Sequence, residues 1–328
     1  MSYQAGSVVS FAALKTEMLS FLVANSWVQE VDIIKKNGVF AKLATGTYSP
    51  SGSYLDLKGG TGSDGAGNLL GEPVVNYNHQ AQRMATFLGQ DAMDGIAWPA
   101  AYRFFLGTNP DYFWCILEYN GSFIQWMGFG NIEKSVTFTG GDFYCASVNG
   151  RESFNANLRL PVTGPDMMVS DGQSGAFEAY AVMPFRSQAV SNGHNAHVGQ
   201  ILHAEIGGLD WYHAVRDANY YTPAGQWMMK SHRFIAEEVQ SAELSVNNMP
   251  SLIPIRLFVR GLDLNWQRVG RLPGLRMTRI SSINLAQVES DGTDSWMFFP
   301  CFKKDASEPN GGTNHSGTYG MAMLYDGP

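Results

Sequence analysis

The chain has 328 residues, of which 45% are hydrophobic and only 16% are charged, and its formal net charge is −7. This composition excludes a disordered chain, because enough apolar residues are present to form a full core. The negative charge argues against nucleic acid as the main partner, since binding to phosphates requires a basic surface. The 36 glycines and the 12% of aromatic residues are typical of a sheet-rich protein with many turns.

Membrane insertion and secretion are not indicated. No apolar run approaches the roughly 18 to 20 residues that cross a bilayer, and residues 1–10 lack the basic and apolar regions of a secretory signal. Cys115, Cys145 and Cys301 contain no C-x-x-C pair, which favours buried, reduced thiols. We therefore expect a chain that folds in a cytoplasm without a disulfide framework.

The first elements expected along the chain are a helix and a hairpin. Apolar residues recur at helical spacing over residues 10–25, where Ser10 is a suitable N-cap. Residues 27–34 predict one strand and residues 39–43 its return, with a turn at Asn37-Gly38 between them.

Two stretches that follow are predicted to be poor in strands. Residues 48–71 consist mainly of Ser, Gly, Thr and Asp, which predicts a long exposed loop with one short strand at 54–57. Residues 79–89 are expected to form a short helix.

The most distinctive segment is the aromatic run at residues 95–147. It alternates like sheet, and turn residues at Asn109-Pro110, Asn120-Gly121 and Gly140-Gly141 divide it, which predicts a meander of strands. It holds few residues of the types that perform acid, base or metal chemistry. A surface or a joint between subunits is therefore favoured for this segment, and a structural component is favoured over an enzyme.

The C-terminal half is predicted to contain further short strands. Taken together, the pattern predicts a mainly-β fold of sandwich- or barrel-like antiparallel sheets, with one N-terminal helix and long Gly-rich loops. Two sheet-rich parts are expected, 1–150 and 151–328, although one intertwined domain is an alternative. The expected strands lie at 177–185, 198–206, 211–215, 234–237, 253–259, 296–302 and 317–325, and a second Gly-rich loop lies at 305–317.

Three motifs suggest chemistry but lack the context that it needs. Residues 60–65 match G-x-G-x-x-G, but more glycines and a proline follow where a dinucleotide site requires a helix. Residues 171–175 resemble a serine nucleophile turn without its last glycine. His194 and His197 have a metal-like spacing, with Glu205 or Asp210 as further ligands, but lie in a polar, loop-like stretch. We expect no cofactor, no metal and no catalytic residue.

Arginines concentrate near the C-terminus and suggest a contact surface. Arg268, Arg271 and Arg276 are interleaved with Trp266 and apolar residues. A nucleic-acid groove is one alternative, but the acidic chain favours a protein interface, where the planar guanidinium pairs with carboxylates. These four residues are the candidate interface.

Aromatic side chains offer an alternative function in binding a host surface glycan. Trp98, Trp211, Tyr212 and Trp227 are the candidate platform, because aromatic faces stack on sugar rings. The same residue types more often fill the core of a sheet protein. Exposure of two or more of these rings in one groove would favour the glycan hypothesis.

Two segments resemble uncharacterised virion proteins of tailed bacteriophages and prophages. The first carries N-P-D-Y at 109–112, G-F-G-N at 128–131 and T-G-G-D-F-Y at 139–144. The second carries G-R-L-P-G-L-R at 270–276 and W-M-F-F-P at 296–300. The resemblance implies a structural protein of the tail, baseplate or neck, assembled in the bacterial cytoplasm as a homo-oligomer with other phage proteins. The alternative at the tail tip is a carbohydrate- or receptor-binding module.

Overall fold

The computed structural model describes a mainly-β protein with one N-terminal helix and several antiparallel sheets, so the predicted sandwich-like fold is confirmed. The described residues are 1–48, 52–73, 81–86, 96–121, 123–150, 187–189, 197–199, 202–207, 210–214, 228–230, 251–260, 266–280, 283–301 and 319–327.

Fourteen strands of the described chain form one large sheet. Its pairs are antiparallel except for β18 with β19. The order is β1 (Ser2–Val8), β9 (Ala100–Gly107), β10 (Tyr112–Tyr119), β11 (Phe123–Asn131), β13 (Gly140–Ala146), β17 (His203–Ile206), β18 (Asp210–Ala214), β19 (Met228–Lys230), β20 (Ile253–Arg260), β21 (Trp266–Arg279), β24 (Tyr319–Tyr325), β23 (Ser295–Pro300) and β22 (Val288–Ser290), and β12 (Glu133–Lys134) pairs with β21.

A second sheet and two small strand pairs complete the described strands. The six-stranded sheet has the order β14 (Val148–Gly150), β8 (Ala81–Ala85), β5 (Gly52–Gly60), β4 (Val39–Tyr48), β3 (Ile33–Lys36) and β2 (Val28–Glu30). The small pairs are β15 (Ser187–Ala189) with β16 (His197–Gly199), and β6 (Gly62–Ser63) with β7 (Leu69–Leu70).

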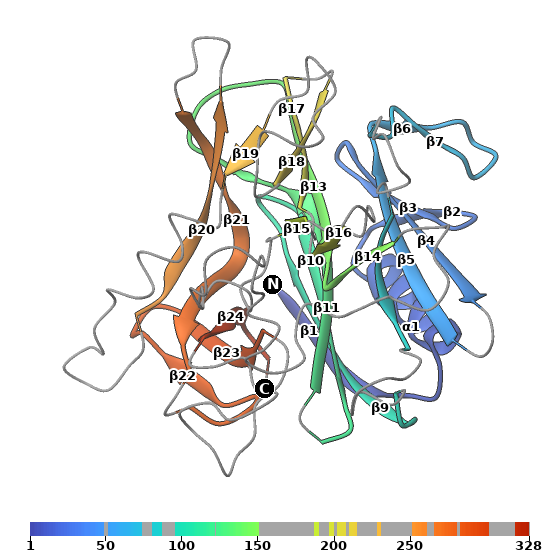
Figure 1. Cartoon of the computed structure of the whole chain (residues 1–328), viewed down its shortest axis with the longest axis vertical. Coiled ribbons are helices and arrows are strands. Elements are labelled where there is room, and N and C mark those ends of the chain that lie inside the picture. The colour runs from blue at the N-terminus through green and yellow to red at the C-terminus, as the bar shows by residue number, and fades with distance from the viewer. Residues whose placement is uncertain are drawn as a thin grey trace.

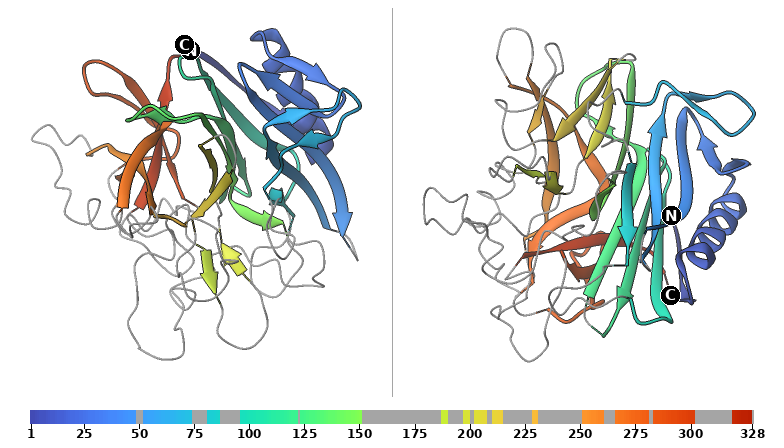
Figure 2. Two further views of the ribbon diagram at one scale, coloured as in Figure 1. Left: turned by 90° about the horizontal axis from the view of Figure 1, so that it is seen from above. Right: turned by 45° about the vertical axis from the view of Figure 1, so that its right-hand side comes forward.

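The strands are arranged in layers around the aromatic meander. Figures 1 and 2 show β9, β10, β11 and β13 between the strands β20 to β24 on one side and the strands β2 to β8 on the other. On β10, Trp114 and Ile116 pack in a core shared with β20, β21, β23 and β24. Phe113, Cys115 and Leu117 alternate with them and pack in a second core, which includes residues of the six-stranded sheet. Each side of the meander therefore supports a core.

This arrangement corrects the expected location of the aromatic segment. We expected a surface or a joint, but residues 112–117 are all buried, because both faces of β10 are covered. Burial of each such large apolar side chain contributes about 1.5–3 kcal/mol. The aromatic residues therefore join two cores within one chain.

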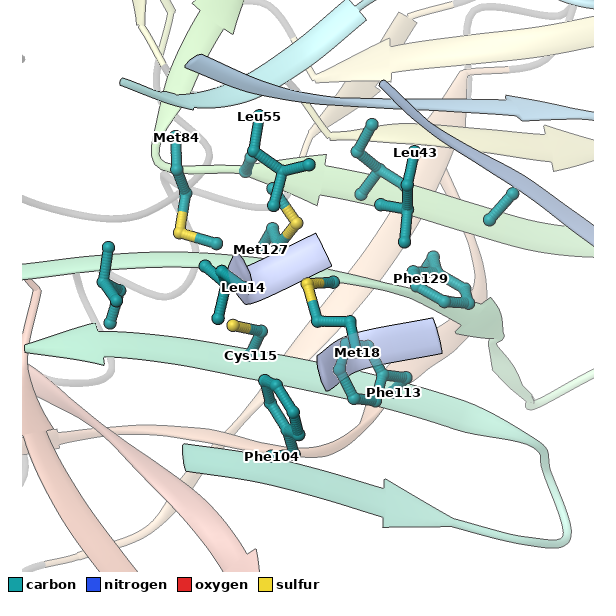
Figure 3. Packing of buried hydrophobic residues seen from close by; sticks show 14 of the residues in the cluster. Leu14, Met18, Leu43, Leu55, Met84, Phe104, Phe113, Cys115, Met127 and Phe129 are labelled. Carbon is teal, nitrogen blue, oxygen red and sulfur yellow. The ribbon is translucent and has the colours of Figure 1, made fainter. Parts of the chain in front are cut away.

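The helix α1 (Phe11–Ala24) begins and ends where the sequence predicted. Ser10 is the N-cap, and its hydroxyl oxygen accepts the N–H of Ala13 at 3.1 Å. Leu14 and Met18 are fully buried and lie among side chains of both large sheets, as Figure 3 shows with Cys115 and Phe113. The helix thus anchors the N-terminus to the second core.

The long exposed loop predicted at 48–71 is wrong in extent: the short strand expected at 54–57 is confirmed, but it is part of the longer strand β5, which spans Gly52–Gly60. β5 pairs with β4 over nine residues, from Phe40↔Gly60 to Tyr48↔Gly52. One of its glycines makes room for an aromatic ring: a Cβ atom on Gly59 would lie 2.4 Å from the ring of Tyr144. Glycine in this strand permits close approach of a packed side chain.

Two other local predictions need correction. The short helix expected at 79–89 is wrong where the chain is described, since β8 is a strand between β14 and β5. The strand expected at 27–34 is broken into β2 and β3 at Val31, whose φ is 55°. A β-branched residue rarely adopts this conformation, so its sequence carries no turn signal.

The later strand predictions differ in outcome. β18, β20, β23 and β24 confirm the strands expected near 211–215, 253–259, 296–302 and 317–325, and β16 and β17 divide the one expected at 198–206. The strands expected at 177–185 and 234–237 and the loop at 305–317 lie outside the described residues. The two expected parts share one sheet, because β13 pairs with β17 across residue 150.

Candidate functional site

Three sequence motifs of the aromatic meander, at 109–112, 128–131 and 139–144, meet at one end of the large sheet. Antiparallel pairing places the turn after β9, the end of β11 and the start of β13 side by side. The backbone N–H of Asn131 donates to the carbonyl oxygen of Asp111 at 2.8 Å. Its side-chain amide donates to Oδ1 of Asp142 at 2.5 Å. Asn131 therefore links the motif at 109–112 to the motif at 139–144.

Glycine is required at two points of this junction. Gly130 has φ 147°, and a Cβ atom there would lie 2.4 Å from the carbonyl oxygen of Asp111. Gly140 has φ 81°, and its Cβ atom would lie 1.6 Å from Oε2 of Glu205. Any side chain at these positions would displace the groups that form the junction.

A polar pocket of about 450 Å³ opens at this junction. The turn between β3 and β4 forms the facing wall, so the pocket lies between the large sheet and the six-stranded sheet. Asn37 and Gly38 form that turn with φ of 47° and 91°, as their sequence predicted. The lining residues are Lys36, Asn37, Thr108, Asn109, Pro110, Asp111 and Asn131.

Asp111 is the charged centre of the pocket and is held from two sides. Only 7% of this residue is exposed. Nζ of Lys36 lies 3.0 Å from its Oδ1, and the side-chain amide of Asn37 donates to its Oδ2 at 2.7 Å. A buried carboxylate needs such partners to offset the loss of hydration. The turn between β3 and β4 is therefore fastened to the meander by this one side chain.

Behind the pocket, Asp142 and Glu205 form a buried acidic pair. Burial raises the pKa of Asp142 to about 7, and the nearby carboxylate of Glu205 adds to the effect. The amide of Asn131 and the ammonium group of Lys134 act in the opposite direction. Oε2 of Glu205 accepts the backbone N–H of Gly141 at 3.1 Å. Asp142 is thus a carboxyl group that changes its protonation near neutral pH.

Of the candidate interface arginines, two serve contacts within the chain. Arg271 forms a two-bond ion pair with Glu133, with Nε at 2.6 Å from Oε2. Arg276 lies over the ring of Trp296 at 5.1 Å, and burial lowers its pKa from the usual value. These contacts join β21 to β12, its neighbour, and to β23, which lies beyond β24 in the same sheet.

The other two candidate interface residues also lie on β21. Arg268 is exposed. Trp266 is in the strand, but its side chain lies outside the described residues. Of the four candidate interface residues, Arg268 is therefore the one whose described side chain is exposed.

The structure does not bring the candidate glycan platform together as an exposed groove among the described rings. Trp211 is buried, and its Nε1 donates to the carbonyl oxygen of Gly71 at 2.8 Å. Trp98 is half-buried and packs edge-on against Phe11. The side chain of Tyr212 and all of Trp227 lie outside the described residues.

Some of the motifs that the sequence analysis set aside also lie within the described residues. Residues 60–65 run from the end of β5 into the β6–β7 hairpin, with no helix following among the described residues there. His203 is buried and stacks on Tyr144 with 4.5 Å between ring centroids. His194 and residues 171–175 lie outside the described residues. Among the described residues, no three His, Cys, Asp or Glu side chains are grouped to hold a metal ion.

Sequence analysis did not single out the pocket residues as a site. Asn37, Asn109, Asp111 and Asn131 were seen only as turn residues or as parts of a resemblance. A signal was available, because Asn and Asp recur beside glycine or proline at successive turns of the meander.

No protein-family model matches the chain, and no curated protein matches it. No described helix is long and apolar enough to cross a membrane.

Proposed function

We propose that the chain is a structural subunit of a tailed-phage virion, in the tail, baseplate or neck, and that it acts through contacts between subunits. Two sequence segments that resemble such proteins support this proposal. The motifs at 109–112, 128–131 and 139–144 adjoin one another in the fold, as parts of one structural unit would. Its partners are further copies of the chain and other phage structural proteins.

The observation that carries the proposal is an exposed valine beside an exposed arginine, where the chain that follows β12 runs along β21. The backbone N–H of Ser135 donates to the carbonyl oxygen of Val269 at 2.9 Å, which continues the pairing of these strands. Val136 follows and is 53% exposed, and Arg268 on the opposite strand is exposed as well. Arginine beside an exposed apolar side chain is the composition that protein interfaces favour.

A second apolar surface lies on the opposite side of the molecule. Val28 and Val31 are 57% and 62% exposed, and β2 is an edge strand of the six-stranded sheet. Figure 1 shows β2 and β21 on opposite sides of the described fold. Contact of one surface with the other on the next copy is head-to-tail and closes into a ring when the rotation permits.

The first test is the mass of the full chain in solution by light scattering, with negative-stain images of the same fraction. We expect a closed ring or another defined oligomer. Arg268→Glu and Val136→Asp are expected to weaken association at least about tenfold, because each places an unpaired charge in the contact. Val288→Asp is the matched control, since Val288 is 41% exposed on β22, and this variant should assemble normally.

Two results would contradict the proposal. A monomer at every concentration, with no chain detected by mass spectrometry in purified phage particles, would exclude a structural subunit. An oligomer whose mass is unchanged by both substitutions would show that β12 and β21 do not form the contact.

A further inference from the structure

The polar pocket between the sheets carries no net charge, although a buried carboxylate lies at its centre. Lys36 and Asp111 are 3.0 Å apart, so the two charges of the lining cancel. A pocket of this kind favours neither a free anion nor a free cation. We propose that it binds a neutral saccharide, as one sugar ring of a larger glycan.

The uncharged lining residues match the hydroxyl groups of a sugar. Asn37, Asn109 and Asn131 carry side-chain amides, which both donate and accept, and Thr108 carries a hydroxyl that does the same. Sugar hydroxyls also donate and accept at one oxygen. The amide nitrogens of Asn37 and Asn131 bind Asp111 and Asp142, so their carbonyl oxygens keep the capacity to accept from a ligand.

The pocket is already organised for binding without further ordering of its central groups. Asp111 is held by Lys36 and Asn37, and Asn131 is held by its bonds to Asp111 and Asp142. Groups fixed before binding lose little conformational entropy when a ligand arrives. The free energy gained from a few hydrogen bonds to the ligand is therefore not offset by the ordering of these groups.

The size of the pocket also suits a single sugar ring. The pocket volume of about 450 Å³ lies within the range of about 300–1,000 Å³ that small-ligand sites occupy. Pro110 adds an apolar surface to the lining, against which the C–H face of a sugar can pack. This site is distinct from the aromatic platform of the sequence analysis, and the inference is independent of the proposed subunit contacts.

The test is saturation-transfer NMR on the full chain with glucose, galactose, mannose and N-acetylglucosamine, and with sialic acid and glucosamine as charged probes. We expect millimolar binding of at least one neutral sugar. Thr108→Ala and Asn109→Gly should each weaken it about three- to tenfold, the effect of one hydrogen bond. Asn109 has φ 67° and is exposed, so glycine removes the amide and keeps the backbone conformation.

Asn120→Gly is the matched control. Asn120 also has a positive φ, 49°, but follows the opposite end of β10, so sugar binding should be unchanged. The proposal is overturned if no neutral sugar binds, if only a charged probe binds, or if both pocket variants bind as the wild type does. Melting temperatures of the variants show whether each has folded. Because the readout is binding to a monosaccharide, failure of subunit assembly does not decide this result.

Discussion

Trp114→Ala is expected to lower the free energy of unfolding by about 3–5 kcal/mol, the range for truncation of a fully buried large side chain. Trp114 is 0% exposed and packs against Trp126 and Phe143. Its Nε1 donates to the carbonyl oxygen of Pro273 at 2.9 Å. The substitution therefore leaves a cavity and an unpaired buried carbonyl between the meander and β21. Urea unfolding followed by circular dichroism measures the change.

Two further variants separate the packing from the hydrogen bond. Trp114→Phe keeps most of the ring but leaves the carbonyl of Pro273 without its donor, which costs about 1–3 kcal/mol. Trp98→Ala is the control, because Trp98 is half-buried and its loss should cost clearly less. If Trp114→Ala destabilised the chain no more than Trp98→Ala, the meander would not join the two cores as described.

A double-mutant cycle with Gly128 tests the contact directly. A Cβ atom on Gly128 would lie 2.1 Å from the ring of Trp114, so Gly128→Ala should destabilise the wild type by overpacking. In the Trp114→Ala background the ring is absent, and the same substitution should cost much less. A strong coupling is expected for residues in contact. Additive effects would show that the ring does not occupy this position.

The sequence predicted elements best where local signals and tertiary packing agree. The helix α1 has its N-cap at Ser10, and the Asn37-Gly38 turn has the positive φ values that this pair tolerates. In both cases the local chemistry alone is sufficient. The alternating aromatic segment was also predicted as strands, but its burial on both faces depends on strands far along the chain.

The failed prediction at 48–71 has a physical cause, which is that glycine occurs both in turns and in tightly packed strands. In residues 52–60 the sequence predicted only a short strand at 54–57 within a loop, because glycine is common in turns. Gly46 on β4 and Gly59 on β5 lie in paired strands and make room for the rings of Tyr54 and Tyr144. Which use applies is decided by a partner distant in the sequence, so local patterns cannot separate them.

The pocket could not be derived from sequence for a related reason. Lys36 and Asn37 belong to one sheet, and Asp111 and Asn131 belong to another, so their meeting depends on how the sheets pack. The arginine cluster was visible in sequence, but its partner Glu133 was not, because it lies 138 positions from Arg271. For the pocket and for the arginines, the residue types show which hydrogen bonds and ion pairs are possible. The packing of the strands determines which of them form.

The second large effect concerns pH, and Asp142→Asn is expected to stabilise the chain increasingly as pH rises. The unfolded carboxyl has a pKa of 3.8 and the buried one a pKa of about 7. Between these values the native state keeps a proton that the unfolded state has lost, so the stability of the wild type falls as pH rises. This group contributes a decrease of about 1.4 kcal/mol per pH unit, which ends above the folded pKa. Asparagine is neutral at every pH and removes this decrease.

The measurement is urea unfolding of wild type and variant at several values between about pH 5 and about pH 8. Asp291→Asn is the control, because backbone hydrogen bonds lower the pKa of that exposed carboxyl. Its contribution is lost only as pH falls through the acidic range, so the difference from wild type should stay constant over these conditions. A constant difference for Asp142→Asn as well would mean that Asp142 is ionised in the folded protein. Asp142 would then be an ionised carboxylate in the buried junction with Asn131 and Glu205, rather than a neutral carboxyl group.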